Sequence, residues 1–305
     1  MAKMISESFV YDLKEGCLCK ILKYVKADST LQFEIRKNYI NIYYRGGSLI
    51  KIKEVSENLY NAYFDKNYIT SNDSEGVIIQ CIEDIDNLEK TRKLIQFIPK
   101  IKQQMDFWMK LKKPDGGERE YKHIVAKENN SGNVGKYSDY FICDIEYTVH
   151  LNKEENYKFD MIGVKWPANS KSRENNNNLS LCIIGMKHNE YEDFNITNYS
   201  SKIYEFITCE EKLSSLKGEI KEIYNIKSQL GLIYPYNNVN IDFGSNIEIL
   251  FIFANQNPRH SKLNTDIENL KKTTVYKNLC NIADIKIAKG SFMGYGLYDE
   301  NLTKI

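Results

Sequence analysis

The stretches KFDMIGVKW (residues 158–166) and LSLCIIGMK (residues 179–187) decide the fold. Both are short, mostly apolar runs bounded by polar residues, a pattern that favours buried β-strands. The Asn-rich insert 170–178 lies between them and predicts a solvent-exposed hairpin loop. A third strand is predicted at 140–150, so the three runs predict one sheet.

Charged residues stand at particular places in these strands. Asp160 is a lone acid in an apolar run, and burying an unpaired carboxylate costs several kcal/mol. It therefore needs a partner, a metal or an exposed strand end. Asp144 and Glu146 are two residues apart, which places both carboxylates on one face of a regular strand. Lys187 ends the last apolar run, where it could lie at the mouth of the sheet.

The rest of the C-terminal half alternates between helix and strand patterns. An acidic segment beginning at Glu118 predicts a short helix, and residues 198–230 read as one bent helix or two. The near-continuous apolar run 247–254 is typical of a buried central strand. Further expected elements are a helix at 263–280 and strands near 283–288 and 293–298.

The N-terminal third has a different pattern. A helix is predicted at 12–27, and residues 82–112 read as a helix that Pro99 kinks or divides. Between them we expect a small antiparallel sheet, with a hairpin turn at Gly46-Gly47 and strands at 31–36, 39–45, 48–55 and 59–64.

The turn-forming sequence Pro114-Asp115-Gly116-Gly117 marks the expected boundary. It predicts an α+β region at 1–115 followed by a mixed-sheet domain at 116–305. The fold class expected for the whole chain is α/β.

Composition limits the classes of protein to which the chain belongs. Hydrophobic residues make up 42% of its 305 residues, which predicts a packed core. The formal net charge is +1, so a strongly basic nucleic-acid binder is not indicated. No apolar run reaches the length of about 18 residues that a membrane span requires. Seven scattered cysteines favour reduced thiols and a cytoplasmic protein.

The order of these elements resembles the core of the PD-(D/E)XK nuclease superfamily, over residues 118–188. In that family an acidic helix and a strand precede an Asp-bearing strand, and a hairpin then leads into an apolar strand that ends Glu-x-Lys. By position, Asp160 looks like the motif's Asp and Lys187 like its Lys. The chain departs from the motif at Gly185, where the second acid is expected.

The resemblance implies a restriction-endonuclease-like mixed sheet flanked by helices, and a divalent metal ion, usually Mg²⁺. Asp160 would hold the ion together with Glu146 or Glu118, and Lys187 would orient the attacking water. The segment Tyr39–Gly47 also resembles one in uncharacterised bacterial proteins that have a nuclease-like C-terminal part. Arg259, which follows the strand at 247–254, could meet a phosphate of nucleic acid or could be an ordinary loop arginine.

Each of these residues also has a structural interpretation. Asp160 could be a strand-end acid that caps a neighbouring helix, Lys187 could begin a solvated loop, and Glu118 could complement a helix dipole. The first functional hypothesis is a metal-dependent nuclease that cleaves DNA rather than RNA. The alternative, favoured by Gly185, is a catalytically inactive nuclease-like fold that binds nucleic acid or protein.

A third hypothesis concerns the N-terminal sheet. Tyr39, Tyr43, Tyr44 and Arg45 could form an aromatic and basic face on which bases stack. The ordinary interpretation of the same residues is a half-buried sheet that exposes some tyrosines.

Overall fold

The structure is a computed structural model in which the chain forms two compact units, Met1–His123 (unit 1) and Ile124–Ile305 (unit 2). It describes residues 4–68, 81–112, 117–130, 132–150, 156–188, 195–234, 240–254, 262–290 and 302–304. The division falls within helix α4 (Glu118–Asn130), a few residues after positions 114–117, where the sequence predicts a boundary.

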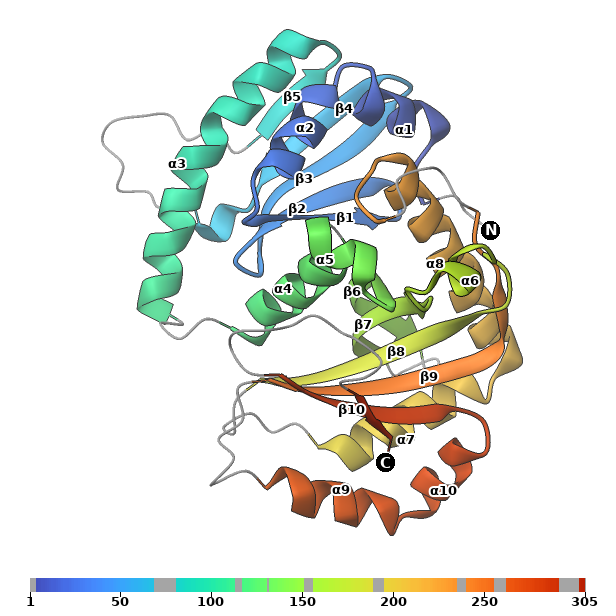
Figure 1. Cartoon of the computed structure of the whole chain (residues 1–305). Helices are drawn as coiled ribbons and strands as arrows, with labels where there is room; N and C mark the ends of the chain where they lie inside the picture. The colour runs from blue at the N-terminus through green and yellow to red at the C-terminus, as the bar shows by residue number, and fades with distance from the viewer. Residues whose placement is uncertain are drawn as a thin grey trace. The chain divides into compact units, whose positions relative to one another are not determined.

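Unit 1 is an antiparallel sheet with helices on one face (Figure 1). The helices are α1 (Glu7–Lys14), α2 (Cys19–Ala27), α3 (Leu88–Lys112) and the short 3₁₀ helix η1 (Lys66–Tyr68). The strands, in spatial and chain order, are β1 (Leu31–Arg36), β2 (Tyr39–Tyr44), β3 (Gly47–Ser56), β4 (Leu59–Phe64) and β5 (Cys81–Ile85).

The core of unit 1 follows from strand alternation. Phe33, Ile42 and Ile52 come from three neighbouring strands, are almost fully buried and point to the helix side. Phe9 of α1 packs on Tyr60 of β4, with ring centroids 4.6 Å apart.

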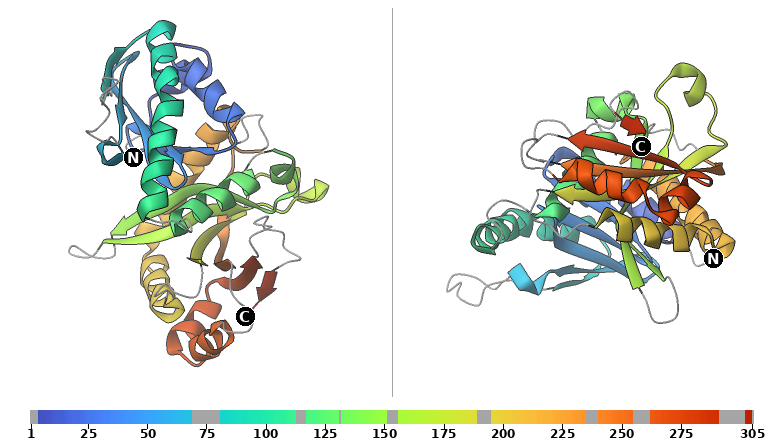
Figure 2. Two further views of the ribbon diagram at one scale, coloured as in Figure 1. Left: turned by 90° about the vertical axis from the view of Figure 1, so that its left-hand side faces the viewer. Right: turned by 90° about the horizontal axis from the view of Figure 1, so that it is seen from below.

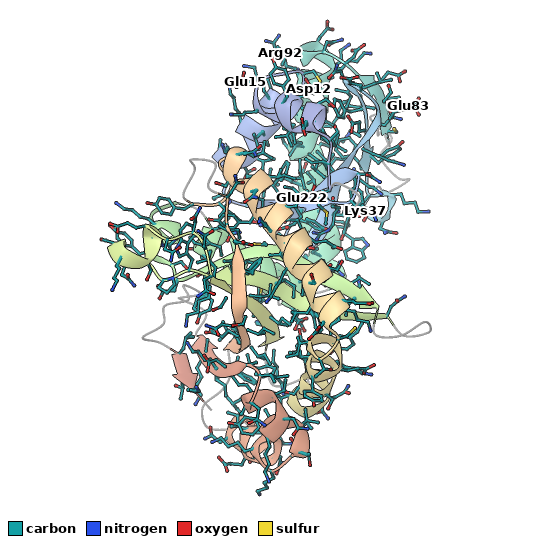
Figure 3. All side chains as sticks on the ribbon, turned by 90° about the vertical axis from the view of Figure 1, so that its right-hand side faces the viewer. Asp12, Glu15, Lys37, Glu83, Arg92 and Glu222 are labelled. Atoms are coloured by element: carbon teal, nitrogen blue, oxygen red, sulfur yellow. The ribbon has the colours of Figure 1, made fainter. Side chains whose placement is uncertain are left out.

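The predicted helix at 12–27 is two helices. The chain between them turns back at Gly16, where a Cβ would collide with the carboxylate of Asp12. That carboxylate is buried and accepts hydrogen bonds from the Tyr60 hydroxyl (2.8 Å) and the Cys17 amide (3.3 Å). Figure 3 shows Asp12 and Glu15 at this turn.

Two other predictions in unit 1 need correction. The hairpin turn is Arg45-Gly46, because Tyr44 pairs with Gly47 and both turn residues have positive φ (46° and 78°). Residues 81–85 form edge strand β5 and not the start of a helix, and α3 then continues through Pro99 without dividing.

Unit 2 is built on a six-stranded sheet. Its helices are α4, α5 (Gly132–Tyr137), α6 (Ser170–Arg173), α7 (Ile196–Ile207), α8 (Glu210–Gln229), α9 (Leu263–Lys271) and α10 (Thr274–Cys280). Its strands are β6 (Tyr140–His150), β7 (Asn156–Lys165), β8 (Leu179–His188), β9 (Phe243–Ala254), β10 (Asp284–Gly290) and β11 (Leu302–Lys304).

The strand order β11-β10-β9-β8-β7-β6 makes this sheet mixed. The three strands β6, β7 and β8 form an antiparallel meander, whereas β8, β9 and β10 run parallel. The predicted α/β class is confirmed, as are the strands expected at 140–150, 158–166, 179–187 and 247–254. The strand expected at 293–298 lies outside the described residues.

Helices cover both faces of this sheet. Figures 1 and 2 show α7, α9 and α10 on one side of it and α4 and α5 on the other. The central strands are accordingly apolar along their length: Ile183, Ile249 and Phe251 are fully buried. In the part of the chain that the structure describes, no helix is both long and apolar enough to span a bilayer.

The outer strand β6 is held by a side chain of α4. The Asn130 amide nitrogen donates to the Ile142 carbonyl (2.7 Å), and its oxygen accepts from the Ile142 amide at the same distance. Asn130 is 3% exposed, so this pair of hydrogen bonds is protected from water.

Candidate functional site

Asp160 lies where strands β7 and β8 part. Their ladder of paired residues runs from Lys165 opposite Ser180 to Met161 opposite Ile184 and ends there. Asp160 is the next residue of β7, and by register it would face Gly185 of β8. The structure therefore places Asp160 opposite Gly185, the position at which the family resemblance leads us to expect a second acid.

A tyrosine from α7 enters between the parted strands. The Tyr199 hydroxyl accepts a hydrogen bond from the Asp160 amide (2.9 Å) and donates one to the Ile184 carbonyl (3.1 Å). The Asp160 carboxylate in turn accepts from the Met186 amide through Oδ2 (2.8 Å). Side chains thus replace the backbone bonds that the ladder loses, and the strands remain joined where their pairing stops.

The ring of Tyr199 also explains the glycine at position 185. A Cβ placed on Gly185 would lie 3.0 Å from Cε1 of Tyr199 and 3.1 Å from Cδ1 of Phe251. Both distances are shorter than ordinary van der Waals contact, so a side chain at position 185 would require these rings to shift by a few tenths of an ångström at its first carbon. The acid expected in the last motif is missing, and an aromatic ring fills its place.

Tyr199 is fixed by other aromatic side chains. Its ring centroid lies 5.7 Å from that of Tyr157, 6.1 Å from Phe159 and 6.0 Å from Phe251. It is 4% exposed. This packing places its hydroxyl and leaves little freedom for the ring to move aside.

Glu146, the predicted auxiliary ligand, lies across from Asp160, between the paired residues Ile145–Met161 and Tyr147–Phe159. Its backbone is left-handed (φ 56°), which interrupts the alternation that would place it beside Asp144. The Glu146 carboxylate lies 4.0 Å from the Lys158 ammonium. The buried Asp144 carboxylate instead accepts the amide of its neighbour Ile145 (2.7 Å).

The remaining predicted residues have ordinary surroundings. Lys187 is partly exposed, two residues beyond Gly185 on β8, and pairs in register with Phe253. Glu118 belongs to unit 1, where it forms an ion pair with Lys122 one helical turn away. Arg259 lies outside the described residues.

These residues do not fit the Mg²⁺ ion that the resemblance implies. Mg²⁺ requires oxygen ligands in near-octahedral geometry. The Asp160 carboxylate instead accepts a hydrogen bond from the Met186 amide, and Gly185 has no side-chain oxygen. Over the described ranges, no group of three or more His, Cys, Asp or Glu side chains has the arrangement of a metal site.

A second charged cluster lies nearer the start of the parallel strands. Glu248 of β9 is 2% exposed, and one of its oxygens, Oε2, lies 2.9 Å from the Lys165 ammonium and 3.2 Å from that of Lys286. Its other oxygen, Oε1, accepts a hydrogen bond from the Tyr140 hydroxyl. Four strands of one sheet are thereby connected through a single buried carboxylate.

The two lysines of this cluster are only 16% and 13% exposed, so the ion pairs are largely removed from water. Cys182 is next to Glu248 in the ladder, and burial, followed by that carboxylate, raises its pKa well above the ordinary value. The thiol therefore stays protonated and serves as an apolar filler. We interpret the cluster as a structural clamp, because its carboxylate is buried and joins side chains of three other strands.

The aromatic and basic face predicted for unit 1 does not form as expected. Tyr44 points to the helix side, where its hydroxyl donates to Asp106 of α3 (2.9 Å). Arg45 pairs with Asp106 (3.1 Å) and Glu120 (3.0 Å). Only Tyr39 and Tyr43 of the predicted set lie on the opposite face.

Comparisons of the chain with protein-family models, with curated proteins and with solved structures gave no match.

Proposed function

We propose that unit 2 is a nuclease-like domain without hydrolytic activity that works as a binding module. The observation that carries this proposal is the Tyr199 ring in front of Gly185, where the second acidic ligand of the nuclease motif would stand. The expectation of an acid at position 185 comes from the resemblance to the PD-(D/E)XK superfamily.

Three features of the site support the loss of metal chemistry. The carboxylate of Asp160 is tied to Met186, and the Tyr199 hydroxyl satisfies the strand groups that a metal site would leave open to water. Glu146 stands on a left-handed turn of the backbone beside Lys158. An ammonium next to a carboxylate competes with a cation for it.

The site is built to hold strands together. Each of its hydrogen bonds joins β7 to β8, directly or through α7, and the Tyr199 ring packs among other aromatic rings. A binding module needs such a rigid sheet and does not need a metal, since recognition uses the surface that the sheet supports.

Calorimetry and cleavage assays on the full chain test the proposal. Mg²⁺ and Mn²⁺ are titrated to millimolar concentration into the wild type and into Asp160→Ala. Supercoiled plasmid, single-stranded DNA and RNA are then incubated with each protein and the same ions. We expect no saturable metal binding and no cleavage above that of a mock purification.

A working nuclease gives the opposite pattern. Metal-dependent cleavage by the wild type that disappears in both Asp160→Ala and Lys187→Ala would overturn the proposal and favour the nuclease hypothesis. Lys171→Ala, an exposed change on α6, is the matched control for Lys187→Ala.

A further inference from the structure

The second face of the unit 1 sheet, the one turned away from α1, α2 and α3, is polar. By alternation it carries Tyr39 of β2, Lys51 and Lys53 of β3, and Asn61 and Tyr63 of β4. We call these five residues the β2–β4 patch. Lys53 is exposed, Tyr63 is 39% exposed, and the other three are partly exposed.

The patch is positively charged although the chain as a whole is nearly neutral. On this face, the strands β2, β3 and β4 carry two lysines and no carboxylate. Glu34 of neighbouring β1 is fully buried and lies 3.8 Å from Arg36, so its charge is offset there. The acidic residues of β5, such as Glu83, lie beyond Tyr63 toward the sheet edge (Figure 3).

The cations of the patch are not used in ion pairs. Among the described residues, neither Lys51 nor Lys53 has an acidic partner within 4.0 Å. The Lys51 ammonium instead lies over the ring of Tyr39, 4.0 Å from its centroid. Three lysines of α3 behave differently: Lys90, Lys93 and Lys102 each pair with a carboxylate.

The tyrosines of the patch are spaced across the sheet. Tyr39 is in register with Lys53, and Tyr63 with Lys51, so the two tyrosines lie on strands separated by β3 and are two residues out of step. Ideal strand spacing and rise place their Cα atoms about 12 Å apart. The Tyr63 hydroxyl accepts the side-chain amide of Asn61 (3.2 Å), which orients its ring.

We propose that the β2–β4 patch binds single-stranded nucleic acid, with phosphates on Lys51 and Lys53 and bases stacked on Tyr39 and Tyr63. Aromatic rings beside unpaired lysines, on the face of an antiparallel sheet, are an arrangement that proteins use to bind single strands without sequence preference. Two tyrosines so far apart receive two separate bases of one strand. An acidic peptide would use the lysines and leave the rings without a role.

Tyr43 does not belong to the patch, although it lies on the same face. His123 packs edge-on against it, with ring centroids 4.8 Å apart, and burial raises the pKa of its hydroxyl. A second aromatic side chain of unit 1 therefore already packs against this ring. This proposal concerns unit 1 and does not depend on the function proposed for unit 2.

Fluorescence anisotropy with the full chain tests the proposal. Labelled 12-nucleotide oligo(dT) and oligo(U) are titrated in EDTA, which prevents metal-dependent cleavage, at 50 and 200 mM salt. We expect binding that weakens with salt, and a salt slope that falls by about 0.7 in each of Lys51→Ala and Lys53→Ala. Tyr39→Ala and Tyr63→Ala should each weaken binding by at least about fivefold, because each loses a stacking platform.

Two exposed residues elsewhere in unit 1 provide matched controls. Tyr11→Ala on α1, 60% exposed, and Lys93→Ala on α3, 61% exposed, should bind like the wild type. Circular dichroism confirms that each variant is folded.

Several outcomes overturn the proposal. One is no binding at 50 mM salt, and another is equal weakening by the patch variants and their controls. Competition by polyglutamate as strong as that by unlabelled oligo(dT) would show a site for acidic chains in place of nucleic acid. Loss of binding in the lysine variants but not in folded tyrosine variants would remove the stacking role and with it the assignment.

Discussion

The ring of Tyr199 and the missing side chain of Gly185 fit one another: a Cβ on Gly185 would lie 3.0 Å from Cε1 of the ring. Neither residue tolerates change independently, because the glycine makes room for the tyrosine and the tyrosine completes the strands on both sides of the glycine. Substitutions at these two positions therefore test whether Tyr199 occupies the place of the acid in the nuclease motif.

Tyr199→Phe should destabilise the protein by about 1–3 kcal/mol. It retains the packed ring but leaves the Asp160 amide and the Ile184 carbonyl without their buried partner. Urea unfolding followed by far-ultraviolet circular dichroism measures the change. Tyr137→Phe, which removes an exposed hydroxyl, should change stability by less than about 0.5 kcal/mol. Equal effects of the two substitutions would contradict the bridging role.

Gly185→Glu should be strongly destabilising, because the new side chain meets the Tyr199 ring and overpacking a core costs about 1–3 kcal/mol before the cost of burying a charge. Combining it with Tyr199→Ala should recover part of the loss, so the two changes should not be additive. In the double variant, millimolar Mg²⁺ should raise the melting temperature. Strict additivity and no response to Mg²⁺ would show that Tyr199 does not occupy the place of the acid.

Glu248→Gln should lower the free energy of unfolding by about 3 kcal/mol. The substitution removes the charge that compensates Lys165 and Lys286, both largely buried, while the amide keeps nearly the same shape. Lys304→Met breaks an exposed pair with Asp284 and should change stability far less, because solvent screens that pair. A Glu248→Gln variant as stable as the wild type would mean that the clamp contributes nothing to folding.

Stability should fall as the pH rises above about 10. Burial, and then the hydrogen bond to Glu219, raises the pKa of Tyr147 above its ordinary value, and burial does the same for Tyr224. Below pH 10 both are protonated in the folded and the unfolded chain. Above it only the unfolded chain loses these protons, which favours unfolding by up to about 1.4 kcal/mol per pH unit for each tyrosine.

Urea titrations at pH 8, 9.5, 10.5 and 11 measure this trend, and absorbance at 295 nm reports tyrosine ionisation. Tyr147→Phe should flatten the decline between pH 10 and 11, whereas Tyr137→Phe should not. A free energy of unfolding that stays constant up to pH 11 would contradict the buried, protonated state of these side chains.

The positions of β6, β7, β8 and β9 could be predicted from the sequence because each contains a dense apolar run that local pattern alone identifies. The turn at Arg45-Gly46 could not be placed from the glycines, since Arg45 also adopts positive φ. Strand β5 was missed because its apolar residues, Cys81, Ile82 and Ile85, also fit helical spacing. Local pattern does not decide between the two when the segment is five residues long.

The site was predicted in part. The pattern of the β7 strand identified Asp160 and its need for a partner, and the partner is an amide of the next strand. Tyr199 was not predicted because it belongs to helix α7, and only the tertiary structure brings it to Gly185 of strand β8. Glu248 carried the same signal as Asp160, an acid inside an apolar run, and the same argument would have found it.

The two hydrogen bonds between Asn130 and Ile142 have a consequence for solubility. An outer strand exposes a row of amides and carbonyls that a strand of another molecule can join, which is how sheets aggregate edge to edge. Asn130 offers Ile142 the donor and acceptor that such a strand would bring. One asparagine thus occupies the outward amide and carbonyl of Ile142, and a strand of another copy cannot pair with this residue of the eleven-residue outer strand.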